Sequence, residues 1–183
     1  ALRAVRAALD ERGLDVGLAA PGFSDLKDGR ELIFDHPQPI ALAAYDAHSW
    51  GRPNAGGLSR WTRRARTAGI AFFLSEMGDM RFGSGDESPG PTTWAANLST
   101  VEKVLVGLNL GVDGFGRWSF TNRGDLDGQF QLVRTWDRES KGYLDEIAPE
   151  PVPYYVYGLL TRLSAKHSTV LKIDVVGGDD LVA

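Results

Sequence analysis

The stretch AFFLSEMGDM, residues 71–80, joins a short apolar run to a glutamate, Glu76, and then to a glycine-containing loop. A continuous apolar run of this length is typical of a buried strand. An ionisable carboxylate at the end of such a strand is costly unless it has a partner or a function. Glu76 is therefore the first candidate functional residue, and the structural alternative is that it caps the next loop or pairs with Arg81 or Arg117.

Helices and strands alternate on both sides of this run. Apolar spacing predicts helices at 1–12, 58–68, 94–108 and 156–163, and apolar runs predict strands at 14–20, 39–50, 70–76, 112–120, 129–133 and 168–176. Regular alternation indicates a parallel sheet with crossover helices. Ligands bind at the carboxyl ends of the strands in such sheets and in (β/α)8 barrels. The polar and aromatic residues at these ends should therefore meet at one rim.

The bulk composition excludes several classes of function. The chain has 183 residues, a net charge of −4 and no cysteine, which removes disulfides, thiol catalysis and thiolate metal sites. The mild charge gives no reason to expect nucleic acid as a partner, and no apolar run approaches the roughly 20 residues needed to cross a bilayer. No glycine-rich phosphate loop stands between a strand and a helix, so nucleotide binding is disfavoured and no cofactor is expected.

A barrel rim accommodates isolated carboxylates, histidines and tryptophans from different strands, but four βα strands cannot close a barrel of eight. The sequence opens in a helical pattern without an initiator methionine or the basic-then-apolar order of a signal peptide. We therefore expect the C-terminal half of a (β/α)8 barrel at 1–167, and a closing strand or the start of a C-terminal β-sandwich at 168–183. The cellular compartment stays undetermined, with secretion one option.

Three motifs carry a resemblance to a known family: AYDAHSW at 44–50, FFLSEMGD at 72–79 and GFGRWSF at 114–120. In this order and at these intervals they resemble the sixth, seventh and eighth strands of clan A glycoside hydrolases, which are retaining glycosidases on a (β/α)8 barrel. The resemblance implies a carbohydrate substrate and a catalytic nucleophile at Glu76. It also implies that the acid/base glutamate, which this clan keeps in an Asn-Glu pair after the fourth strand, lies in a missing N-terminal half, because the chain contains no Asn-Glu dipeptide. The isolated chain is then expected to be inactive.

Five other residues are candidates for contacts with the sugar, and each has a structural alternative. His48 either orients Glu76 or is a hydrogen-bonded structural histidine. Trp118 either packs its flat face on a pyranose ring or fills the barrel end, and Tyr45 and Trp50 are similar candidates. Asn122, in the loop after the last barrel strand, is a candidate for binding sugar hydroxyls, although turn chemistry explains that loop equally well.

Two alternative functions stay open at this point. One is a non-catalytic carbohydrate-binding or scaffold barrel that retains the aromatic residues of the rim without the chemistry. The other is a metal-dependent barrel hydrolase using Asp46 and His48, although the three histidines of the chain show no metal-ligand spacing and no metal site is expected.

Overall fold

The computed structural model describes residues 2–26, 42–82, 90, 92–121, 130–137, 140–164 and 168–171. The elements follow the chain as α1 (Leu2–Glu11), β1 (Ala19–Phe23), β2 (Ala44–Ser49), α3 (Ala55–Ala68), β3 (Ala71–Met77), the 3-10 turn η1 (Met80–Phe82), α4 (Trp94–Leu110), β4 (Gly114–Arg117), β5 (Val133–Asp137), β6 (Gly142–Pro149) and α5 (Pro151–Leu163). None of the helices in these ranges is long and apolar enough to span a membrane.

The central element is a parallel sheet with the strand order β1-β2-β3-β4. The crossover from β2 to β3 contains α3, and the crossover from β3 to β4 contains α4. The predicted strand–helix alternation with parallel pairing is therefore confirmed as a mixed α/β arrangement. A separate antiparallel pair, β5–β6, follows the sheet.

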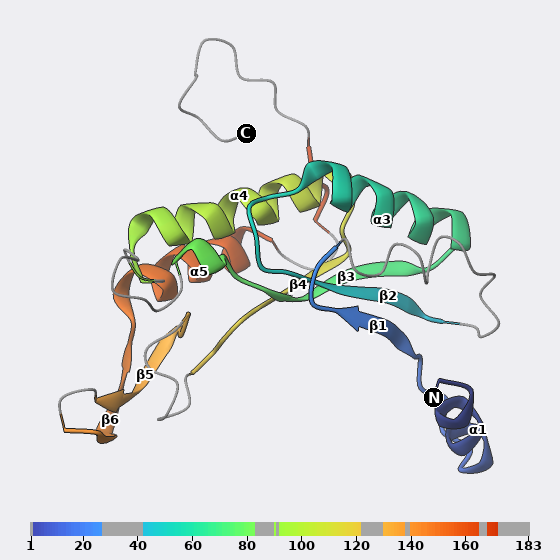
Figure 1. Ribbon diagram of the computed structural model, residues 1–183, viewed down its shortest axis with the longest axis horizontal. Coiled ribbons are helices and arrows are strands. Elements are labelled where there is room, and N and C mark those ends of the chain that lie inside the picture. The colour runs from blue at the N-terminus through green and yellow to red at the C-terminus, as the bar shows by residue number, and fades with distance from the viewer. Residues whose placement is uncertain are drawn as a thin grey trace, which may run out of the picture.

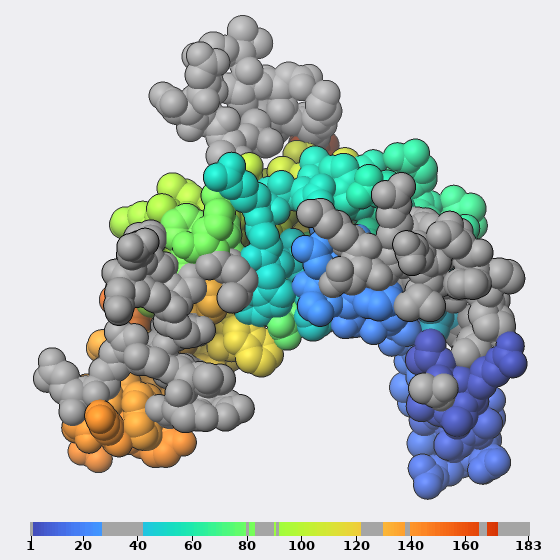
Figure 2. Space-filling view, viewed as in Figure 1, coloured from blue at the N-terminus to red at the C-terminus, as the bar shows by residue number. Residues whose placement is uncertain are grey.

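Helices α3, α4 and α5 lie on one side of the parallel sheet (Figure 1). No helix in the described ranges covers the opposite face, and the molecule is hollowed on that side (Figure 2). Phe73 and Ser75 of β3 are exposed there, and Phe73 retains 37% of its accessible surface. Because parallel sheets are normally covered on both faces, this face is an unusual feature of the fold.

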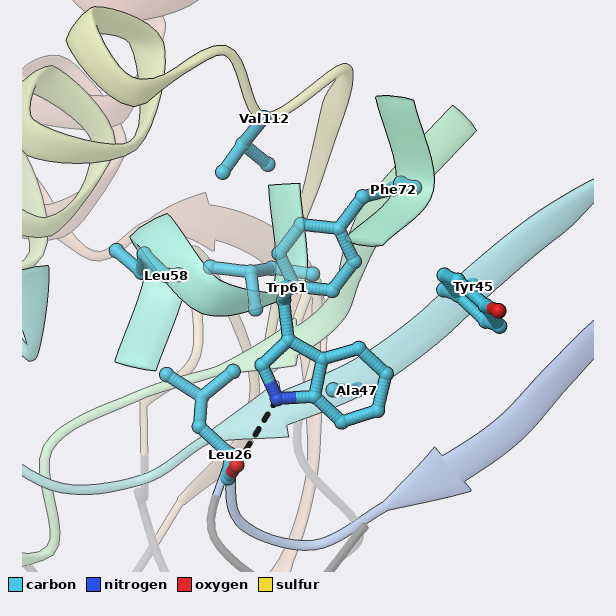
Figure 3. Packing of buried hydrophobic residues seen from close by; sticks show 9 residues of the cluster. Leu26, Tyr45, Ala47, Leu58, Trp61, Phe72 and Val112 are labelled. Carbon is cyan, nitrogen blue, oxygen red and sulfur yellow. Dashed lines mark hydrogen bonds between the residues drawn. The ribbon is translucent and has the colours of Figure 1, made fainter. Parts of the chain in front are cut away.

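The hydrophobic core lies between α3 and the covered face of the sheet (Figure 3). Trp61 of α3 stacks on Phe72 of β3 with ring centroids 5.4 Å apart, and Tyr45 of β2 meets Trp61 edge-on at 5.8 Å. The Trp61 indole nitrogen donates a hydrogen bond to the Leu26 carbonyl oxygen at 2.9 Å, which ties the segment after β1 to the core. Full burial of these aromatic rings stabilises the packing of α3 on the sheet.

Helix α4 is present where the sequence predicts a helix, but its apolar stripe does not face the sheet. Trp94 and Leu98 are 62% and 56% exposed. The buried residues are mostly small or polar: Ala96, Asn97, Ser99, Thr100, Lys103, Val104 and Gly107. Glycine at 107 permits close packing, because a β-carbon there would come within 2.6 Å of the Phe115 ring. An apolar stripe usually marks the buried face, so here tertiary packing overrides the pattern.

Several predicted boundaries are wrong. The first strand runs over Ala19–Phe23 rather than 14–20, because the Arg6 guanidinium of α1 holds the Leu14 and Val16 carbonyls outside the sheet. The short strand predicted at 129–133 begins only at Val133, and its partner β6 was not predicted. Helix α5 starts at Pro151, five residues before the predicted 156, since proline is tolerated in the first helical turn. Residues 168–171 form no strand, and the rest of the predicted strand lies outside the described residues.

Candidate functional site

Glu76 lies at the carboxyl end of β3, beside the end of β2. In the parallel register His48 pairs with Glu76, and the histidine Nδ1 lies 3.5 Å from the glutamate Oε1. Both side chains are about one-quarter exposed, at 23% and 24%. The predicted meeting of the two strand ends at one rim therefore occurs, with the imidazole and the carboxylate in contact.

An irregularity in β2 and β3 decides which way Glu76 faces. Strict alternation would place Glu76 on the same face as the buried Phe72 and Leu74. The register shifts at the end of these strands, between Ala47 and His48 and between Leu74 and Met77. Met77 consequently takes the next buried position with no exposed surface, while Glu76 stays partly exposed. Bulges of this kind often re-aim side chains next to functional sites.

Trp50, directly after β2, is the hydrogen-bond donor to the carboxylate. Its indole nitrogen donates to the Glu76 Oε1 at 2.8 Å. The ring lies against Gly78, where an added β-carbon would sit 2.4 Å from the indole Cζ3. The orientation of Trp50 therefore depends on a residue without a side chain at 78. This hydrogen bond fixes the position of the Glu76 carboxylate at the rim.

Aromatic rings extend the rim beyond Glu76. Trp118, which directly follows β4, is 46% exposed and meets Trp50 edge-on with centroids 6.5 Å apart. Phe130 lies on Trp50 at 5.4 Å and is buried. Trp118 therefore keeps nearly half of its surface open while contacting Trp50, the donor to Glu76.

A cavity of about 340 Å³ adjoins Trp50 at the start of α3. Its lining is mostly polar and includes Asp25, Ser49, Arg52 and Asn54. Asn54 also caps α3, because its side-chain oxygen accepts from the Gly57 amide at 2.8 Å. Donors and acceptors of this kind suit a ligand rich in hydroxyl groups.

The two arginines that the sequence offered as partners of Glu76 bind other groups in the structure. Arg81 pairs with Asp79, a buried carboxylate that also accepts from the Ser99 hydroxyl. Burial alone would raise the pKa of Asp79, but the hydrogen bonds from Arg81 and Ser99 outweigh burial and leave the pKa below its ordinary value. Arg117 donates to the Phe130 carbonyl, and burial lowers its pKa to about 10.

Tyr45 does not join the rim. It is fully buried in the core against Trp61, because its position in β2 faces the helix-covered side of the sheet. Because its side chain is not accessible to solvent, Tyr45 cannot contact a sugar at the rim.

Asn122 lies outside the described residues. Within the described ranges no group of three or more His, Asp or Glu side chains forms a candidate metal site, so Asp46 and His48 have no third ligand there.

Sequence reasoning missed the lysine that lies beneath the site. Lys103 of α4 is 1% exposed, and its ammonium group donates to the Ser49 carbonyl at 2.8 Å and to the Gly78 carbonyl at 2.6 Å. Burial lowers its pKa to about 8. A lysine on a helix usually predicts a solvated position, so only its packing against two strand ends identifies it.

Comparisons with known proteins add a structural likeness. No protein-family model matches the sequence, and no curated protein matches it. Among solved structures, a β-glycosidase from Pyrococcus horikoshii superposes with a TM-score of 0.45 and 13% sequence identity over 83% of this chain. The match covers 49% of that enzyme, so the chain spans about half its length.

Proposed function

We propose that this chain is part of a retaining glycoside hydrolase, with Glu76 as its nucleophile. The observation that carries the proposal is the 2.8 Å hydrogen bond from the Trp50 indole to the Glu76 Oε1 at the carboxyl end of a parallel strand. A neutral donor keeps the carboxylate in place without neutralising it, as a glutamate that attacks carbon requires. The partly exposed Trp118, in edge contact with Trp50, supports a sugar as the substrate, since pyranose C–H groups pack on indole.

In the proposed reaction, a Glu76 oxygen attacks the anomeric carbon of the sugar. The bond from that carbon to Glu76 forms while the glycosidic C–O bond breaks, and the leaving oxygen takes a proton from a second carboxyl group. Water then attacks the same carbon, gives its proton to that second group, and frees Glu76. Retaining enzymes hold the two carboxyl groups about 5–5.5 Å apart. We assign the second group to a polypeptide segment beyond this chain, because the chain has no Asn-Glu pair.

The same segment is proposed to complete the barrel as the N-terminal half. Strands β1 and β4 are the two edges of the parallel sheet, and one face of the sheet has no described cover. Open edges and an uncovered parallel face are both unfavourable in water. Further parallel strands that pair with β1 and β4 would cover both edges and enclose the uncovered face.

Covalent labelling tests the nucleophile. The complete protein is incubated with 2-deoxy-2-fluoro glycosides that carry an activated leaving group, and the modified peptide is identified by mass spectrometry. We expect the label on Glu76 in the wild-type protein, no label in Glu76→Gln, and full labelling in Glu146→Gln, an exposed β6 control. Labelling of Glu76→Gln at the wild-type rate would refute the assignment. Sugar binding without any labelling would favour the non-catalytic carbohydrate-binding alternative.

A further inference from the structure

Lys103 occupies a position where a lysine is hard to explain by stability. It lies on the sheet-facing side of α4 and is 1% exposed. Removing an ammonium group from water costs more than burying an apolar side chain of similar length. A methionine at this position would fill the space without that cost. Stability alone therefore does not explain why an ammonium group occupies this position.

The ammonium group connects the two strand ends that carry the candidate site. It donates to the carbonyl of Ser49, the last residue of β2, and to that of Gly78, directly after β3. The Gly78 amide in turn donates to the same Ser49 carbonyl at 3.2 Å. Lys103 therefore ties the end of β2 to the residue after β3, just beyond the pair formed by His48 and Glu76.

Each of the two carbonyls belongs to a residue that determines where Trp50 lies. Ser49 precedes Trp50 in the chain, and Gly78 provides the surface on which the Trp50 ring rests. The ring position determines whether the indole nitrogen reaches the Glu76 Oε1, at 2.8 Å in the structure. A shift of either carbonyl would therefore change the length of that hydrogen bond.

We propose that Lys103 is a positioning residue that aligns Trp50 with the Glu76 carboxylate. Its importance for turnover rests on the proposed glycosidase function, whereas its effect on the Trp50–Glu76 hydrogen bond does not. In the part of the chain that the structure describes, its ammonium group bonds the two carbonyls and not Glu76, so it acts through those carbonyls.

The protonation of Lys103 makes this alignment sensitive to pH. Burial lowers its pKa to about 8, while Asp79 after β3 raises the pKa and Arg81 in η1 lowers it. Asp79 and Arg81 themselves keep their charges between pH 7 and 9, since the pKa of Asp79 is lowered and that of Arg81 is raised. Above pH 8 the two charge-assisted hydrogen bonds become weaker neutral ones.

The indole N–H resonance of Trp50 provides a readout that does not depend on activity. It is assigned in a ¹H–¹⁵N spectrum by its loss in Trp50→Phe. We expect it to shift in Lys103→Met, to return toward its wild-type position in Lys103→Arg, and to stay in place in Thr100→Val. Thr100 is a matched control because it is buried one turn earlier and its hydroxyl donates to the Ala96 carbonyl within α4. In the wild type the resonance should also move with a midpoint near pH 8, and this movement should be absent in Lys103→Met.

Labelling of Glu76 by the activated fluoroglycoside provides the second readout. We expect Lys103→Met to reduce the labelling rate roughly 10- to 100-fold, the range expected for a misplacement near 1 Å. An unmoved indole resonance in a folded Lys103→Met variant, or an equal shift in Thr100→Val, overturns the positioning role. If wild-type Glu76 is never labelled while the resonance behaves as expected, the proposed function fails and the positioning role stands.

Discussion

The substitution Gly78→Ala tests how the candidate site is held together. The added β-carbon would lie 2.4 Å from the Trp50 Cζ3 and 2.9 Å from its Cε3, and ordinary contacts begin at 3.4 Å. The indole ring must therefore retreat by about 1 Å, or the loop after β3 must move. Either movement takes the indole nitrogen out of range of the Glu76 Oε1, now 2.8 Å away.

The expected cost follows from the loss of that hydrogen bond. Hydrogen bonds to charged groups contribute about 1.5–3 kcal/mol, and water can replace the donor at a partly exposed carboxylate. We therefore expect Gly78→Ala to lower the free energy of unfolding by about 1–2 kcal/mol. Urea denaturation measures this change, and a shift of the Trp50 indole resonance reports the movement of the ring.

Gly51→Ala is the matched control, because an added β-carbon there meets no atom within 4 Å. It should change the free energy of unfolding by less than about 0.5 kcal/mol, as surface substitutions usually do. If Gly78→Ala leaves both the stability and the Trp50 resonance unchanged, the contact between Gly78 and the indole does not determine the ring position. Equal effects of the two substitutions would point to a general effect of alanine on the backbone instead.

Three further predictions concern the stability of the fold. Between pH 8 and 10.5 the unfolded chain binds more protons at Lys103 than the folded chain does. The free energy of unfolding should therefore rise with pH by up to about 1.4 kcal/mol per pH unit relative to Lys103→Met, as urea denaturation across that range would show. Trp61→Phe removes the donor to the carbonyl of buried Leu26 and should lower the free energy of unfolding by about 2–4 kcal/mol in urea denaturation. An unchanged free energy of unfolding would mean that this carbonyl finds another donor. Asn54→Ala removes the cap on the Gly57 amide and should cost about 1 kcal/mol in the same assay, while Asn54→Asp should retain most of it.

The type and order of the main elements follow from local patterns. The apolar run at 70–76 predicts the strand that the structure places at Ala71–Met77, and apolar spacing predicts α3 and α4. These patterns are reliable because side chains repeat every two residues along a strand and every 3.6 along a helix. The meeting of His48 with Glu76 also follows from the sequence, since parallel strands end at the same edge.

Contacts between distant segments explain where such patterns fail. The antiparallel strand β6 depends on pairing with β5, and the start of β1 depends on Arg6 of α1, neither of which leaves a local signal. The apolar stripe of α4 predicts a helix but not the face that packs on the sheet. That face is small and polar because it must approach Phe115 closely and bring Lys103 to two carbonyls.

The sequence by itself determined a parallel α/β arrangement with a carboxylate at the end of a strand, because periodicity and strand order are properties of the chain. Only the tertiary structure decided that this carboxylate avoids the core, since the register shift before Met77 reverses the alternation that Phe72 and Leu74 establish. It also decided which side chain binds Glu76. Trp50 reaches it because Gly78, a neighbour in space rather than in sequence, leaves room for the indole ring.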